Sequence, residues 1–238
     1  MRASLIWDDM LCMLAALALL LVAAIPARAQ NRPPAPAADM LASPNHPGWS
    51  VDRRTGCWIW DDTPQQKDRV TWSGACAADG RATGHGVLEW RWRGNVSRYE
   101  GDMLEGKRSG HGIADSGGAH FEGEWRDDRA NGRGVIIWPN GDRYDGEFRD
   151  GQPSGHGVGL ATNGMRYEGE LANGEPNGHG VSAWVNGDRY DGNWKDGRPD
   201  GEGEALIKGK TYRGTWAAGC YRAGDRNVAI TRSASECP

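Results

Sequence analysis

The chain has little phenylalanine and no surplus of positive charge: 2 residues are Phe, and 28 Lys and Arg face 32 Asp and Glu. A net charge of −4 gives no broad basic surface, so we expect no nucleic-acid partner. Collagen-like triplets are absent, and 38% hydrophobic residues exclude a disordered polyelectrolyte. Nucleophile elbows, phosphate loops, dinucleotide fingerprints and Cys-x-x-Cys pairs are also lacking. We therefore expect no catalytic residue, no metal and no other cofactor.

The sequence also lacks an apolar run of the roughly 20 residues that span a bilayer. Residues 10–25 form a shorter uncharged, mostly apolar run, and Ala27-Arg28-Ala29 follows as a small-x-small cleavage site. This pattern predicts a signal peptide over residues 1–29 and an exported protein, either periplasmic or secreted. An uncleaved N-terminal anchor is the alternative interpretation.

Four cysteines remain after the predicted cleavage: Cys57, Cys76, Cys220 and Cys237. An even number in an exported chain predicts two disulfides, for which three connectivities are possible. The sequence separations of 19 and 17 favour Cys57 with Cys76 and Cys220 with Cys237. Each such disulfide closes a short loop, which stabilises a fold by about 3 kcal/mol in the chain-entropy model.

What the chain has in excess is glycine, 36 of 238 residues, and it is placed periodically. An aromatic-x-Gly pattern recurs every 22 or 23 residues, beginning at Tyr99, Phe121, Tyr144, Tyr167, Tyr190 and Tyr212. Eleven residues after each of the first five aromatics comes Gly-x-Gly, as at Gly155 and Gly157. A degenerate earlier copy begins at Trp72. A nearly fixed period of this kind indicates a repeat architecture.

Turn dipeptides divide each period into two strands. Asn140-Gly141 precedes one aromatic and Asp150-Gly151 follows it, and such pairs supply the positive φ of tight hairpin turns. We predict strands near residues 142–149 and 155–161, with no room for a helix. The array is then an all-β antiparallel meander of tandem hairpins.

Alternation along a strand assigns its two faces. In Tyr144-Asp145-Gly146-Glu147-Phe148 the rings and the glycine share one face and the carboxylates share the other. We expect the glycine to leave a notch that receives a ring from a neighbouring hairpin. Arg143 and its counterparts, Arg98, Arg166 and Arg189, belong to the acidic face, where they can pair with flanking carboxylates.

Taken together, Tyr-Asp-Gly-Glu-Phe, then Asp-Gly, then Gly-His-Gly-Val, then Asn-Gly resemble the MORN repeat over residues 72–216. The resemblance implies an elongated, twisted single-sheet array, and roles in scaffolding, self-association or phospholipid attachment. The organisation expected is a Pro/Ala-rich linker over 30–55, a cap with the degenerate copy over 56–98, repeats over 99–216 and a second cap over 217–238. The two disulfides would then close the two ends.

The ring-bearing face is the candidate partner-binding surface. Its members are Tyr99, Phe121, Trp125, Tyr144, Phe148, Tyr167, Tyr190, Trp194, Tyr212 and Trp216. The alternative is that these rings are core, because a single sheet buries one face only if something covers it. Sequence alone leaves both open.

Two polar series compete with the rings as candidate sites. His85, His111, His156 and His179 occupy the middle of Gly-x-Gly, but equivalent positions lie about 9.6 Å apart, too far to share one zinc ion. Carboxylates recur as regularly, whereas a catalytic pair would be a singular feature. Both series are interpreted as surface residues.

The resulting hypothesis is a non-catalytic binding or scaffolding module of the cell envelope that contacts another protein or itself. Attachment to a phospholipid surface is the first alternative, although residues 72–216 carry 18 basic against 23 acidic side chains and no basic cluster. A hydrolase or metal enzyme is the second.

Overall fold

The structure is a computed structural model that describes residues 48–61, 69–224, 226–231 and 233–237. The predicted signal peptide and most of the predicted linker lie outside these residues. The described chain falls into two compact units, one ending at Pro139 and one beginning at Asn140.

The unit that ends at Pro139 is an antiparallel meander with a small N-terminal cap. Its strands are β1 (Trp49–Val51), β2 (Trp58–Trp60), β3 (Arg69–Trp72), β4 (Ala75–Cys76), β5 (Ala82–Trp92), β6 (Asn95–Leu104), β7 (Lys107–Ser116), β8 (Ala119–Arg126) and β9 (Arg129–Ile137). Strands β3 and β5 to β9 follow one another in the sheet, β4 pairs with β5, and β1 pairs with β2.

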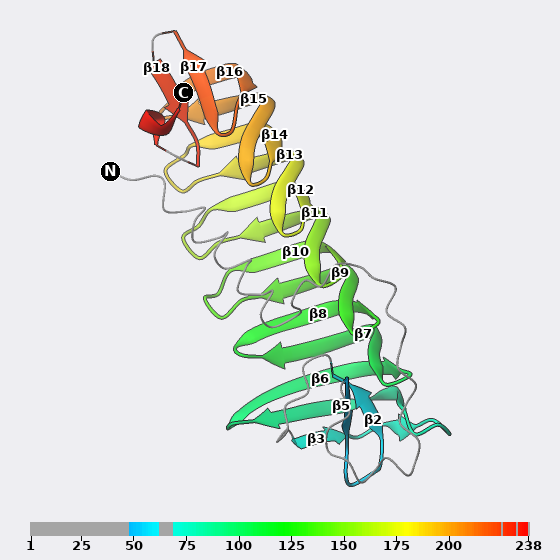
Figure 1. The fold of residues 1–238 in the computed structure, drawn as a ribbon. Coiled ribbons are helices and arrows are strands. Elements are labelled where there is room, and N and C mark those ends of the chain that lie inside the picture. Colours follow the sequence, from blue (N-terminus) through cyan, green and yellow to red (C-terminus); the bar gives the residue numbers. More distant parts are fainter. Residues whose placement is uncertain (1–47, 62–68, 225, 232, 238) are drawn as a thin grey trace. The chain divides into compact units, whose positions relative to one another are not determined.

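The unit that begins at Asn140 continues the same plan. Its strands are β10 (Arg143–Arg149), β11 (Gln152–Leu160), β12 (Arg166–Ala172), β13 (Glu175–Ala183), β14 (Arg189–Lys195), β15 (Arg198–Ile207), β16 (Lys210–Trp216), β17 (Cys220–Ala223) and β18 (Arg226–Ala229), followed by the short 3-10 helix η2 (Ala234–Glu236). Strands β10 to β16 lie in chain order, and β17 pairs with β18. The predicted all-β meander is thus confirmed (Figure 1).

The hairpin turns form where the dipeptides predicted them. Asp150 has a φ of 50° and Gly151 a φ of 89°, the left-handed pair that matches the twist of the flanking strands. Asn173-Gly174 and Asp196-Gly197 repeat this geometry. We call these turns the hairpin tips.

Each hairpin also carries a β-bulge near its glycines. The register of β10 with β11 shifts between Gly146 and Phe148, and β12 with β13 and β14 with β15 shift at the equivalent positions. The first glycine of Gly-x-Gly adopts the left-handed region there, with φ of 80° at Gly155. A bulge bends the strand, and the hairpins curl on the side of the sheet where β11, β12 and β13 are labelled in Figure 1.

Successive tips are joined by backbone hydrogen bonds. The N–H of Gly174 donates to the carbonyl of Pro153 at 2.8 Å, and Gly197 donates to Pro176 at 3.1 Å. The Asn-Gly loops, at the strand ends away from the tips, are linked by side chains. The Asp142 carboxylate, for example, accepts from the Thr162 N–H at 2.7 Å. In the unit that begins at Asn140, neighbouring hairpins are thus joined at the tips and at the Asn-Gly loops.

The ordered N-terminal cap includes part of the range predicted as linker. Strand β1 pairs Trp49 with Trp60 and Val51 with Trp58, and Trp49 is buried. The predicted linker, residues 30–55, thus overlaps the cap at its C-terminal end.

Candidate functional site

The ring-bearing face, called the inner face from here on, is buried. Nine of the ten candidate residues expose at most 4% of their surface: Tyr99, Phe121, Trp125, Tyr144, Phe148, Tyr167, Tyr190, Trp194 and Trp216. Tyr212, in the last strand of the sheet, is half-buried. In this structure these nine rings pack as core residues.

The inner-face glycines are covered by a ring of their own hairpin. A Cβ on Gly146 would lie 2.6 Å from the Cα of Gly157, and a Cβ on Gly157 would lie 2.5 Å from the Cζ of Tyr144. The Tyr144 ring thus leans along its own strand over both glycines. The expectation that a neighbouring hairpin's ring fills the notch was wrong, because the side chain two residues earlier reaches the space first.

The tyrosine hydroxyls complete this arrangement. The Tyr144 hydroxyl donates to the carbonyl of Glu147 at 3.1 Å, and Tyr167 donates to Glu170 at 2.7 Å. Burial raises the pKa of both hydroxyls, so each remains a protonated donor at physiological pH. The hydrogen bond fixes each ring over its glycine pair.

Contact between hairpins is ring against ring. Trp194 meets Tyr167 of the preceding hairpin edge to face, with ring centroids 5.6 Å apart, and its indole N–H donates to the Gly180 carbonyl at 2.9 Å. Trp125 repeats both contacts, with Tyr99 at 5.4 Å and Gly112 at 3.1 Å. Such pairs contribute about 0.5–1.5 kcal/mol beyond their burial.

The opposite, outer face carries paired charges as the alternation predicted. Each arginine of the predicted series bonds the carboxylate two residues later in its strand, as Arg143 does with Asp145 at 2.9 Å. The other pairs are Arg98 with Glu100, Arg166 with Glu168, and Arg189 with Asp191. Exposed pairs of this kind contribute only about 0–1 kcal/mol each to stability, so their main effect is to keep this face polar.

The four Gly-x-Gly histidines are exposed on this outer face. Two of them lie beside aspartates, His85 with Asp102 at 3.1 Å and His179 with Asp191 at 3.3 Å. Among the described residues no group of three or more His, Cys, Asp or Glu is arranged to hold a metal ion.

Some outer-face carboxylates have a local structural role. A Cβ on Gly155 would lie 2.9 Å from the Glu147 carboxyl carbon, and Glu170 lies in the same way beside Gly178. These glycines are the left-handed residues of the bulge. Each carboxylate thus packs on the bend of its own hairpin.

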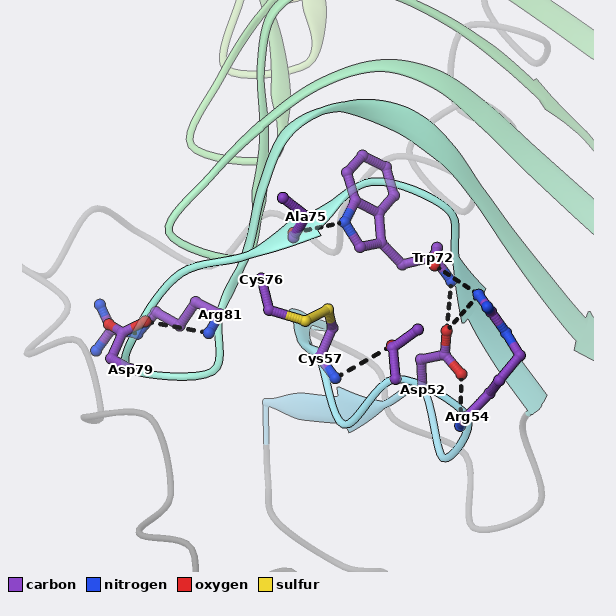
Figure 2. The surroundings of a disulfide bond; sticks show 9 residues. Asp52, Arg54, Cys57, Trp72, Ala75, Cys76, Asp79 and Arg81 are labelled. Atoms are coloured by element: carbon purple, nitrogen blue, oxygen red, sulfur yellow. Dashed lines mark hydrogen bonds and ion pairs between the residues drawn. A yellow bond between two sulfur atoms is a disulfide. The ribbon is translucent and has the colours of Figure 1, made fainter.

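The N-terminal end of the sheet is closed by a buried charge. Asp52, 1% exposed, accepts from the backbone N–H of Trp72 at 3.0 Å, and the Arg54 guanidinium donates to the Trp72 carbonyl at 2.9 Å (Figure 2). These two backbone groups of β3 are therefore satisfied by side chains instead of by a further strand. The Cys57–Cys76 disulfide lies beside this contact and joins the cap to the sheet.

Burial acts to raise the pKa of Asp52, but the hydrogen bonds outweigh it. The N–H groups of Trp72 and Arg54, the Thr55 hydroxyl and the Arg54 guanidinium all favour the carboxylate, and the pKa lies below its usual value. Asp52 is thus ionised at neutral pH.

The C-terminal end is arranged differently. The tip at Ala218-Gly219 follows β16, and Gly219 donates to Pro199 at 2.7 Å, as at the preceding tips. The chain then turns into the β17–β18 hairpin, which the Cys220–Cys237 disulfide fastens. Tyr221 packs its ring 5.2 Å from that of Trp216 and donates its hydroxyl to the Arg213 carbonyl at 2.9 Å.

Both disulfides thus have the predicted pairing. The contacts of Asp52 and Arg54 with Trp72 were not predicted, since they join segments about 20 residues apart that lie outside the period. An aspartate two residues before an arginine is too common a pattern to have identified this contact.

Within the described residues, no helix is both long enough and apolar enough to cross a membrane.

Comparison with known proteins agrees with this geometry. The MORN repeat family model matches six segments, residues 78–94, 99–116, 121–143, 144–166, 167–189 and 190–205. Among curated protein sequences, none matches the chain.

Proposed function

This chain belongs to the MORN repeat family, and from that premise we propose that it is an exported, non-catalytic binding or scaffolding protein of the cell envelope. Repeats of this family are generally binding or scaffolding modules. The partner is another protein or a second copy of the chain.

One observation carries the proposal: the same ring, glycine and tip geometry recurs from hairpin to hairpin, and within the described residues no reactive group departs from the series. Nine inner-face rings are committed to the core, so the array is a framework, and contact falls to its outer face and ends. The two disulfides support export, because disulfides persist in oxidising compartments.

Burial of the rings also bears on the lipid alternative. Apolar insertion needs exposed apolar side chains, and these nine rings are unavailable for it. The acidic balance of residues 72–216 gives no attraction to anionic headgroups. We therefore place protein contact before lipid contact.

The test is crosslinked affinity capture from an envelope extract, using the mature disulfide-bonded chain and identification by mass spectrometry. Light scattering of the purified chain measures self-association in parallel. A reproducible partner or a stable oligomer supports the proposal. A monomer that captures nothing, or a chain that co-sediments with vesicles at high salt, would overturn it.

A further inference from the structure

The last strand of the sheet has one edge without its repeat partner. β16 carries Tyr212, Gly214 and Trp216, the same pattern as Tyr190, Gly192 and Trp194 in β14. β14 pairs with β13 on one side and β15 on the other, whereas β16 pairs with β15 only. In the described part of the chain, no strand pairs along its second edge.

The missing partner is the second strand of its own hairpin. After the tip at Ala218-Gly219, Tyr221 stands where the other hairpins have Pro153, Pro176 or Pro199. The chain leaves the sheet there to form β17 and β18. Tyr212 is consequently half-buried, while Tyr190 is fully buried.

The paired hairpins define what such an edge accepts. In β12–β13, Gly169 faces Gly180, and a Cβ on Gly180 would lie 2.6 Å from the Cζ of Tyr167. In β14–β15, Gly192 faces Gly203 with the same 2.6 Å distance to Tyr190. The residue opposite the ring is small in both, Ser182 or Ala205. An added strand thus needs glycine opposite Gly214 and a small residue opposite Tyr212.

Tyr221 holds this edge loosely. Its hydroxyl bonds the Arg213 carbonyl in an exposed position, and a Cβ on Gly214 would lie 3.2 Å from its ring. An exposed hydrogen bond of this kind is weak in water. The backbone of an added strand, which offers β16 several hydrogen bonds, can therefore displace the Tyr221 ring.

We propose that the second edge of β16 binds an extended segment of a partner protein by strand addition, with the pattern Gly-x-Gly-x-Ser or Gly-x-Gly-x-Ala. The inference deepens the proposed binding function and rests on it. Main-chain hydrogen bonds supply the attraction, and the Tyr212 ring selects glycine. A second copy is a poorer occupant, because its strands β11, β13 and β15 already pair with a strand on both sides.

The probe is a labelled synthetic peptide of residues 177–185, which contains Gly178, Gly180 and Ser182. Binding to the full mature chain is measured by fluorescence anisotropy, and hydrogen exchange locates it. We expect saturable binding with protection confined to β16, and a loss of about tenfold or more for the Gly180→Val peptide. The matched control, His179→Ala, changes the outer face and should bind like the parent.

A chain variant sharpens the test. Tyr221→Phe removes the hydroxyl from Arg213, so the parent peptide should bind more tightly to it. Equal binding of the parent and Gly180→Val peptides, protection outside β16, or no saturation would overturn strand addition. If the peptide fails while affinity capture yields a partner, the binding function stands and only this site is lost.

Discussion

Each end of the sheet has an edge strand with backbone groups that no further strand pairs, and the side-chain contacts to these groups differ in strength between the two ends. At the N-terminal end a buried carboxylate and a guanidinium bond the N–H and carbonyl of Trp72. At the C-terminal end one exposed tyrosine hydroxyl bonds the carbonyl of Arg213. Exposed edges invite pairing with other chains. The first end is closed by side chains, and the second is the end at which we propose strand addition.

The largest difference between the ends should come from glycine replacement. In Gly86→Val the new Cβ would lie 2.6 Å from the Gly74 nitrogen and 2.7 Å from the Trp72 ring, with backbone on one side. We expect a loss of about 3 kcal/mol or more. In Gly214→Val the new Cβ would meet only the movable Tyr221 ring, and the φ of 139° adds backbone strain. We expect this variant to lose about 1–2 kcal/mol in free energy of unfolding. Urea unfolding measures both, and equal losses would contradict the closed and open ends.

The disulfides offer a comparison at matched loop length. Their sequence separations are 19 and 17, so the chain-entropy model gives about 3 kcal/mol for each. Cys57 and Cys76 replaced together by alanine, and Cys220 and Cys237 likewise, should therefore lose similar free energies of unfolding. A larger loss for the Cys57 and Cys76 variant would mean that the packing of Cys57, which is fully buried, adds to the stability that the disulfide provides.

Asp52→Asn should cost about 2 kcal/mol at neutral pH, since hydrogen bonds to an ionised acceptor are lost. The pKa of Asp52 is lowered in the folded state, so its contribution is present above the ordinary Asp pKa and disappears as the pH falls through the folded value. The difference between wild type and variant should shrink from about pH 4 downward. Asp79→Asn, at an exposed carboxylate, is the control. A difference that persisted at acid pH would contradict the ionised contact.

The smallest effect should be that of Tyr221→Phe. It removes one exposed hydrogen bond to Arg213 and keeps the ring against Trp216, so we expect about 0.5 kcal/mol or less. Thermal unfolding followed by circular dichroism measures it. A loss as large as that of Asp52→Asn would mean that the C-terminal end is closed as firmly as the N-terminal end.

Local chemistry explains which features could be predicted from the sequence. Asp150-Gly151 and its equivalents specify left-handed turns by themselves, and the period repeats the evidence, so strands, tips and faces were predictable. The cysteine pairing followed from separation alone. The outer-face pairs of Arg143 and its counterparts followed from alternation.

Contacts that depend on three-dimensional bending were not predictable in this way. The lean of Tyr144 over Gly146 and Gly157 depends on ring direction and on the bulge, neither of which the alternation specifies. Burial of the inner face depends on the same bend. Residues Trp49–Val51 form strand β1 because they pair with β2, whereas the composition of residues 30–55 indicated only a linker.

The bonds between tips have a consequence for how such a protein can change over time. Gly174 reaches back to Pro153, Gly197 to Pro176 and Gly219 to Pro199, each spanning one period and no more. A duplicated or deleted period would meet the same donors and acceptors at the seam, while both termini kept their own contacts. The number of hairpins can thus change in whole periods while both ends keep their own contacts.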